Sequence, residues 1–305
     1  MPIKAVRQSK LLSSLRFQTC VTGIVVNATL VLIGIFCILP IVMIVSASFS
    51  AEEDVATNGY PIIPRVFSTQ AYEYVLRDTS QIFRSYLLTS TVTVTGSSAS
   101  LLMMSMFAYV LARVSFPWRN HLSFFLFFTM LFSGGLVPWY ILITQYLHMR
   151  NTFWALIVPA LLSPWYVFLL RTYLRGLPGE VIEAAKIDGA GEWRIFFQIA
   201  VPLSTPALAT VALFCMLNFW NDWWLGLLFI DDRKWAPLQL LLYRIQNNIA
   251  FLESAPMKTT GIVVRVPAMT TRMAMAVLAI GPIGLAYFFV QQYFVRGITI
   301  GSIKG

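Results

Sequence analysis

Residues Leu177–Pro206 read LPGEVIEAAKIDGAGEWRIFFQIAVPLSTP and differ sharply in composition from the apolar sequence on both sides. This stretch contains four acids and three glycines, and it lies between two apolar runs that are each long enough to cross a bilayer. A charged segment with turn-forming glycines in that position indicates a solvent-exposed element fixed at a membrane face. The composition and motifs of the surrounding sequence indicate what class of protein contains this element and which partner would contact it.

The composition is that of an integral membrane protein. Of the 305 residues, 58% are apolar and only 11% are charged, whereas soluble domains contain about 25% charged residues. The formal charge of +9 does not indicate nucleic-acid binding, because the cations are spread along the chain and gather at the ends of apolar runs. The three cysteines fall at or inside apolar runs, which favours packing residues over a disulfide or a metal site. We therefore expect membrane lipid, and no nucleic acid, as a partner.

Six apolar runs predict an all-α membrane fold with a single transmembrane domain over residues 21–305. The first run, 21–49, follows an amino-terminal segment, 1–20, with four cations and no acid, which places that segment in the cytoplasm. A cleaved secretory signal is the alternative, but its hydrophobic region would span only about 7–15 residues. The other spans are expected at residues 86–111, 122–136, 153–170, 206–230 and 273–294, with the tail 295–305 also in the cytoplasm.

Small and helix-breaking residues interrupt several of these runs. The second span is rich in Ser, Thr and Gly, which favours close helix packing, with a polar solute pathway as the alternative. Gly134-Gly135 and Pro138 predict a broken or bent third span, which either lines a cavity or is a simple helix end with a re-entrant turn. Pro159 and Pro164 predict kinks in the fourth span.

Within the loop 177–205, the sequence predicts two short helices separated by a glycine turn. Pro178 suits the first turn of a helix, and Gly189 suits a left-handed cap at its end. A second helix would start at Glu192 and end before Pro202. Its apolar residues are spaced to share one face that lies flat on the membrane; these are Trp193, Phe196, Phe197 and Ala200.

The same loop resembles a known signature. Glu183-Ala184-Ala185, followed by Gly189, Ile199 and Pro202, matches the EAA motif of permease subunits of bacterial ATP-binding-cassette importers, with Val201 in place of the usual Leu. The run EAAKIDGAGEWRIFFQIAVPLSTPAL is similar to the carbohydrate-uptake branch, which includes the smaller permease of the maltose importer. The tail Gly301–Gly305 and the segment Phe219–Asp222 resemble that branch as well.

The resemblance implies a binding-protein-dependent importer in the bacterial cytoplasmic membrane. Its expected partners are a second six-helix permease in a heterodimer, two ATPase subunits and an extracytoplasmic solute-binding protein. By resemblance, the first loop helix is the coupling helix that docks on the ATPase, through Glu183, Ala184, Ala185, Asp188, Gly189 and Ala190. Trp193, Phe196, Phe197 and Pro202 would support it, and Ser302 and Lys304 of the tail would also reach the ATPase.

No catalytic signature accompanies these motifs. The sequence lacks a GxxxxGK[ST] phosphate loop and an HExxH metal motif, and its two histidines, His121 and His148, lie far apart. We therefore expect a non-catalytic permease without a cofactor of its own, with ATP and Mg bound by the partner ATPase.

The fifth span carries an unusual polar and aromatic group, Asn218, Trp220, Asn221 and Asp222. An acid inside a span costs about 2.5–3.5 kcal/mol at mid-bilayer and is by default a functional candidate. We expect these residues to line the substrate pathway or to contact the binding protein, with an aromatic belt at the outer interface as the alternative. The function expected overall is ATP-driven import of a sugar, most simply an oligosaccharide, by alternating access. The alternatives are the same machine carrying a peptide or glycerol phosphate and, remotely, a membrane enzyme.

Overall fold

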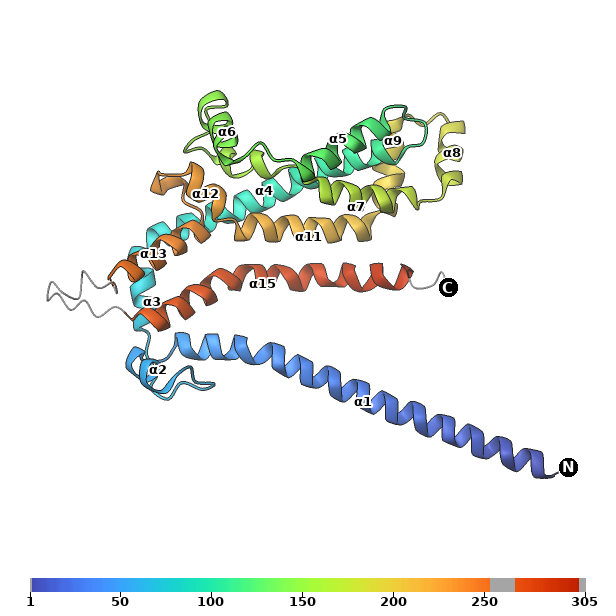
Figure 1. Cartoon of the computed structure of the whole chain (residues 1–305), viewed down its shortest axis with the longest axis horizontal. Coiled ribbons are helices and arrows are strands. Elements are labelled where there is room, and N and C mark those ends of the chain that lie inside the picture. The colour runs from blue at the N-terminus through green and yellow to red at the C-terminus, as the bar shows by residue number, and fades with distance from the viewer. Residues whose placement is uncertain (1, 253–266, 302–305) are drawn as a thin grey trace. The chain divides into compact units, whose positions relative to one another are not determined.

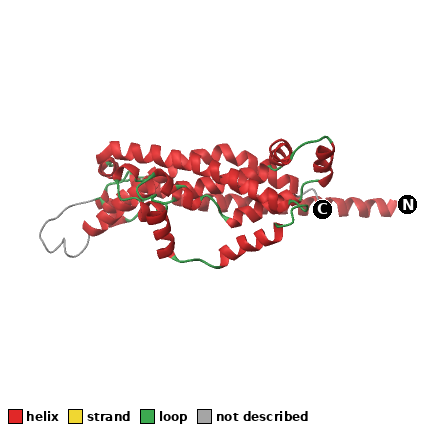
Figure 2. Ribbon diagram, turned by 90° about the horizontal axis from the view of Figure 1, so that it is seen from above, coloured by secondary structure: helices red, strands yellow, loops and turns green. Residues whose placement is uncertain are grey.

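The computed structural model describes residues 2–252 and 267–301, and the side chains of residues 22–252 and 267–284. Within these ranges the protein is built from helices joined by loops, and a β-bridge pairs Ser50 with Phe67. Figure 2 shows the helices accounting for nearly all regular structure. The predicted all-α fold is confirmed. The helices group into two compact units, Met1–Val75 with Arg265–Val277 and Leu76–Val264 with Leu278–Gly305.

The first unit contains α1 (Pro2–Ser48), α2 (Glu52–Asn58), α3 (Gln70–Val75) and the start of α15 (Ala268–Gly301). The Thr22–Ser48 part of α1 has a mean hydropathy of 2.9, and none of its most apolar window is buried within the protein. Such a surface suits lipid. The start of α15 is held by the Glu52 carboxylate, which accepts the Met269 and Thr270 backbone N–H groups at 2.8 and 2.9 Å. An acid at a helix amino terminus satisfies donors that the helix itself cannot pair.

The second unit is organised around α4 (Thr79–Ala112), which packs against α7 (Pro164–Arg175) and α11 (Thr205–Asn221). Figure 1 shows these three helices running side by side. Asp78 caps α4 by accepting the Gln81 N–H at 3.1 Å. The shared core is apolar and fully buried; its members include Met104, Leu111, Val167, Leu170 and Val211. The predicted packing role of the small residues in α4 is clearest at Gly96, where a methyl group would lie 2.9 Å from the Phe219 ring.

The third expected span is broken, as its glycines and proline predict. α5 (Arg119–Leu131) is followed by α6 (Leu136–Ile141), which continues as a π-helix over Leu142–Tyr146. The two helical pieces form an angle of 111°. Gly135 in the break has a φ of 87°, a left-handed conformation that a side chain would strain.

The fourth and fifth expected spans are not continuous helices. The region predicted as helix from residue 153 forms 3₁₀-helices at Phe153–Leu156 and Val158–Ala160, and α7 begins only at Pro164, at 52° to them. The predicted kink in this span is present as the 52° bend, and Pro164 stands at the first turn of α7, which suits the start of a helix. α11 ends at Asn221, and α12 (Trp224–Phe229) follows after a turn. A 3₁₀-helix, Arg233–Trp235, and α13 (Leu238–Leu252) occupy the expected outer loop.

Length and hydropathy identify the membrane spans only in part. Within the described residues, Thr22–Ser48 and Gln70–Ala112 qualify alone, and three bent helix pairs could each form one span, giving up to five candidates. The sixth expected span, 273–294, falls within α15, of which Ala268–Gly284 qualifies as a shorter apolar helix. The second unit includes α15 from Leu278 onward, where Trp220 donates its indole N–H to the Ala279 carbonyl at 2.9 Å.

Candidate functional site

The loop 177–205 forms a small platform beyond the ends of α7 and α11 (Figure 1). It consists of α8 (Gly179–Ile187), α9 (Glu192–Ile195), a π-helix over Phe196–Ala200 and α10 (Val201–Leu203). The segment from α9 to α10 lies at 83° to α11 and therefore does not extend that helix across the membrane. Glu183 and Ala184 are exposed on α8, and Ile187 at its end is 86% exposed. The outer face of α8 is therefore accessible from solvent.

The end of α8 is closed by a glycine cap, as predicted. Gly189 has a φ of 77°. Its N–H donates to the Lys186 carbonyl at 3.0 Å, and the Ala190 N–H donates to the Ala185 carbonyl at 2.9 Å. This pair of bonds is the Schellman motif, which satisfies carbonyls left over at a helix end. The cap fixes the direction in which the chain leaves α8.

Glu192 connects the platform to α4. Its carboxylate accepts the Tyr109 hydroxyl at 2.7 Å and the Arg113 guanidinium at 2.8 and 3.1 Å. The Lys186 ammonium of α8 lies 3.1 Å from the same carboxylate. The Arg113 guanidinium also sits over the Tyr109 ring, 5.0 Å from its centroid. One side chain thus links α8, α9 and the end of α4.

The electrostatics of this Glu192 network favour an ionised carboxylate. Burial on its own would raise the pKa of Glu192, but the hydrogen bonds from Tyr109, Arg113 and Lys186 outweigh that effect and lower the pKa to about 2. The acid therefore stays charged at every physiological pH.

The predicted apolar face of the second loop helix is wrong in part. Phe196 and Ala200 are 3% and 1% exposed and face the core, where Phe196 packs edge-on against Tyr109 with ring centroids 5.2 Å apart. Trp193 and Phe197 are 65% and 50% exposed and stack on each other. The four residues therefore form two pairs at i, i+4 spacing, one on the buried face and one on the exposed face, where the chain passes from α9 into the π-helix over Phe196–Ala200. Pro202 lies in α10 and is exposed.

A groove of about 470 Å³ separates α8 from the ends of α4 and α7. Three cations, Arg113, Arg175 and Lys186, line it together with Glu183. Glu183 therefore stands at the rim of a basic groove while remaining exposed to a partner.

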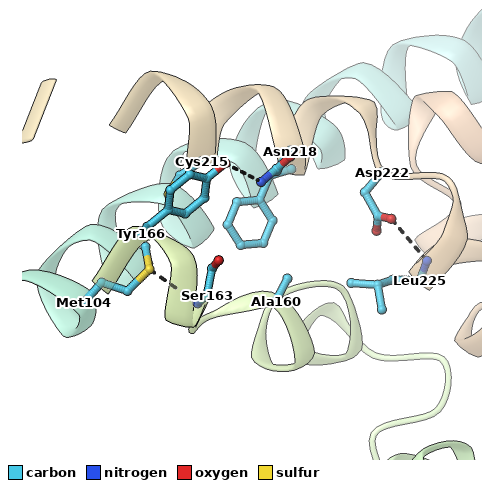
Figure 3. A pocket seen from close by; sticks show the side chains of 9 residues that line it. Met104, Ala160, Ser163, Tyr166, Cys215, Asn218, Asp222 and Leu225 are labelled. Carbon is cyan, nitrogen blue, oxygen red and sulfur yellow. Dashed lines mark hydrogen bonds between the residues drawn. The ribbon is translucent and has the colours of Figure 1, made fainter. Parts of the chain in front are cut away.

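A separate cavity of about 290 Å³ lies between α4, α7, α11 and α12 (Figure 3). Its polar lining residues are Ser163, Tyr166, Asn218 and Asp222, and its apolar ones are Met104, Ala160, Cys215, Phe219 and Leu225. The Asn218 amide donates to the Tyr166 hydroxyl at 3.3 Å. Asp222 Oδ1 accepts the Trp224 and Leu225 N–H groups at 3.1 and 3.3 Å, which explains why α11 ends there and α12 begins.

The structure divides the four residues predicted for the substrate pathway. Asn218 and Asp222 line the cavity together. Trp220 is 3% exposed and packs near Tyr86 with ring centroids 6.5 Å apart, so it is a packing residue rather than an aromatic belt residue. Asn221 bonds back to the Leu217 carbonyl of its own helix at 2.9 Å. Neither Trp220 nor Asn221 lines the cavity.

Residues 102–300 match a protein family described as "Binding-protein-dependent transport system inner membrane component". The chain belongs to this family. It is 36% identical over 276 residues to a polygalacturonan/rhamnogalacturonan transport system permease protein of Bacillus subtilis, covering 90% of this chain and 96% of that protein. It is 29% identical to a trehalose/maltose transport system permease protein of Thermococcus litoralis over 90% of this chain and 94% of the relative. A permease chain in the crystal structure of a bacterial ABC transporter that imports the acidic polysaccharide alginate is 28% identical, with a TM-score of 0.74 and coverage of 90% and 96%.

In this permease, sequence reasoning missed the residues that hold the platform. Tyr109 and Arg113 lie 83 and 79 residues before Glu192, and no local pattern pairs them. The sequence contained only weak signals for this network. Glu192 is an acid at the start of an expected interfacial helix, and Arg113 is an arginine at the end of an apolar run. Ser302 and Lys304 of the tail lie outside the described residues.

Proposed function

We propose that this permease is the transmembrane subunit of an ATP-driven importer for an oligosaccharide, working by alternating access. The observation that supports this most is the similarity, over 90% of the chain, to a permease named for polygalacturonan/rhamnogalacturonan transport. Further relatives are named for arabinooligosaccharide and diacetylchitobiose uptake. The chain has no ATP-binding motif, so we propose that separate ATPase subunits bind ATP and Mg and hydrolyse ATP.

The proposed docking surface for the ATPase is α8 with its glycine cap. Glu183 supplies an exposed carboxylate for a cation of the ATPase, and the small exposed Ala184 allows close approach. Ala185 is partly buried and packs α8 against the core. Ile187 adds an apolar contact that is 86% exposed. Asp188, Gly189 and Ala190 shape the end of the helix. Trp193, Phe196, Phe197 and Pro202 support the platform from the membrane side.

The proposed assembly contains this chain, a second six-helix permease, two ATPase subunits and an extracytoplasmic solute-binding protein. Both termini are proposed to face the cytoplasm, in keeping with the four cations of the segment 1–20. Ser302 and Lys304 of the tail are further proposed contacts with the ATPase. Asn218 and Asp222 are the proposed substrate-pathway residues, because they share the 290 Å³ cavity.

A glycan binding screen on the cognate solute-binding protein tests the substrate class. We expect selective binding of an oligosaccharide. A clear preference for peptides or for glycerol phosphate over every glycan would refute the sugar assignment while leaving the transport function intact.

The docking role of α8 is tested with two variants in the reconstituted complex. Glu183→Lys reverses the exposed charge, and Gly189→Asp places a side chain at a φ of 77°. Both are expected to abolish substrate-stimulated ATPase activity while the protein remains in the membrane. Glu180→Lys, at an exposed acid of the same helix outside the motif, is the matched control. Normal coupling in either test variant would refute the docking role.

A further inference from the structure

Three arginines gather where α5 begins and α7 ends. Arg119 is the first residue of α5, which packs against α7, and Arg171 and Arg175 lie in the last two turns of α7 (Figure 1). Residues spaced at i, i+4 lie on the same face of a helix. Arg171 is close enough to Arg119 and Arg175 for both of their charges to repel its own. We call these three residues the arginine cluster.

The described part of the chain does not neutralise this cluster. None of the described acids forms an ion pair with its members, whereas Arg113 at the end of α4 is paired with Glu192. Glu183 and Arg175 line the same groove beside α8 without forming a pair. The Arg171 Nε is buried and has no hydrogen-bond partner among the described residues. Like charges held together without a counterion cost stability, so the cluster would gain from binding an anion.

The chemistry of the cluster favours a phosphate. Guanidinium groups bind phosphate oxygens through two parallel N–H donors, and they hold their charge under all physiological conditions. The Arg171 guanidinium also lies over the Phe168 ring, 5.9 Å from its centroid, and this contact restrains its position. A phosphate at this point would receive donors from two helices at once.

The surface next to the cluster indicates that the phosphate belongs to a lipid. Trp118, which precedes α5, is exposed, and tryptophan is enriched where a bilayer meets water. From there α5 presents an exposed apolar surface that includes Phe124, Phe125, Phe128 and Leu131. A free phosphate would use only the arginines, whereas a phospholipid would also cover this apolar surface with its acyl chains.

We propose that the arginine cluster binds the phosphate of an anionic phospholipid whose acyl chains lie along the exposed face of α5. An anionic headgroup is favoured over a zwitterionic one, because the amine of a zwitterionic lipid would meet three cations and no paired acid of the described residues. Basic pockets at the cytoplasmic ends of spanning helices are suited to such headgroups. Arg175 also lines the groove beside α8, so the lipid would lie next to the loop platform. This proposal does not depend on the solute that is transported.

The experiment titrates the complete transporter, purified in detergent, with phosphatidylglycerol or with phosphatidylcholine of identical acyl chains. Native mass spectrometry counts the bound lipids. Each Lys or Arg near a charged membrane surface strengthens the binding of anionic lipid about fivefold. The wild-type transporter is therefore expected to bind phosphatidylglycerol at least about tenfold more tightly than phosphatidylcholine. Inorganic phosphate, which has the charge but no acyl chains, is expected not to displace the bound phosphatidylglycerol.

Two variants and a control test the residues. Arg171→Gln and Arg175→Gln are each expected to reduce the preference for phosphatidylglycerol about fivefold. Arg194→Gln removes an exposed cation of the platform outside the cluster and is expected to leave the preference unchanged.

Thermal unfolding of the same samples separates lipid binding from a structural role. In phosphatidylcholine, Arg171→Gln is expected to be at least as stable as the wild type, because removing one of three like charges relieves their repulsion. In phosphatidylglycerol, the wild type is expected to be the more stable of the two. A purely structural arginine would instead lower the stability equally in both lipids.

The outcomes are distinct. Equal binding of the two lipids to the wild type, or a preference that survives both cluster variants, overturns the proposal. Displacement of phosphatidylglycerol by inorganic phosphate shows a site for small anions and overturns the lipid assignment. Equal destabilisation of Arg171→Gln in both lipids assigns this arginine to structure alone and overturns its role in binding. None of these results bears on the proposed transport function, because no solute takes part in the assay.

Discussion

Replacing Glu192 with Gln removes the charge that joins the loop platform to α4 while keeping the shape of the side chain. Gln can still accept a hydrogen bond from Tyr109 or Arg113, but it attracts neither Arg113 nor Lys186 electrostatically. The Arg113 side chain is only 14% exposed. Water therefore solvates its guanidinium poorly and does not replace the interaction with the lost carboxylate.

The size of the effect follows from the exposure of the two partners. Fully exposed ion pairs are worth about 0.2–1 kcal/mol, whereas removing one partner of a buried pair costs about 3–5 kcal/mol. The Glu192 and Arg113 side chains are 54% and 14% exposed, which places this pair between the two cases. We expect a loss of about 1–2 kcal/mol, equivalent to a factor of about 5–30 in the population of the correctly held platform.

The assay is substrate-stimulated ATPase activity of the reconstituted complex, with the thermal unfolding of the same sample. Glu192→Gln is expected to lower the stimulated rate several-fold and to leave the unstimulated rate unchanged, because the ATPase subunits themselves are intact. Glu180→Gln removes an exposed carboxylate from the same loop and serves as the control. A double-mutant cycle with Arg113→Gln should show non-additive losses. Wild-type stimulation in Glu192→Gln, or strictly additive effects with Arg113→Gln, would refute the role assigned to the network.

Two further predictions test the electrostatics and the packing. The pKa of Glu192 in the folded protein is about 2, below the ordinary value of 4.5, so its stabilising contribution is complete above pH 4.5 and is lost only as the pH falls toward 2. The Glu192-dependent part of the unfolding free energy should therefore be equal at pH 7 and pH 5.5. A drop over that range would contradict the assignment. Gly96→Ala places a methyl group 2.9 Å from the Phe219 ring and should destabilise the complex by about 1–3 kcal/mol in thermal unfolding, whereas Gly34→Ala, with nothing within 4 Å, should not.

The features that the sequence predicted are those set by neighbouring residues. Gly189 indicated a left-handed cap, and its φ of 77° confirms it. Gly134-Gly135 and Pro138 indicated the break that appears as a 111° bend. In both cases the backbone preference of a few adjacent residues decides the geometry, so a local pattern is sufficient.

The features that the sequence did not predict depend on distant contacts or on altered helix geometry. Glu192 and Arg113 are 79 positions apart in the sequence. Neither an acid nor an arginine in a sequence identifies the residue with which it will pair. The expected face of Trp193, Phe196 and Phe197 assumed a regular α-helix, which the π-helix over Phe196–Ala200 replaces. The prediction of a continuous fifth span is wrong at Asp222. The short side chain of this residue accepts hydrogen bonds from the first N–H groups of α12, so α11 ends there and a new helix begins.

These contacts connect the platform to the membrane helices. By resemblance, Trp193, Phe196 and Phe197 were expected to support the coupling helix, with a shared face on the membrane. In the structure Phe196 packs on Tyr109 of α4, and Glu192 binds Tyr109 and Arg113 of the same helix. A displacement of α8 would therefore act on the end of α4 first.

The helix α4 also reaches the cavity, together with α7, α11 and α12. Met104 lines the cavity, and Gly96 sets the position of the Phe219 ring, which lines it as well. From Arg113 to Gly96 the helix rises about 25 Å at 1.5 Å per residue. A close-packed helix of this length transmits a displacement with little internal compression, because its core neighbours leave few voids. The platform and the cavity thus both contact α4, at Arg113 and at Met104. We propose that a movement of α4 would couple them, with α11 following through the contact of Phe219 with Gly96.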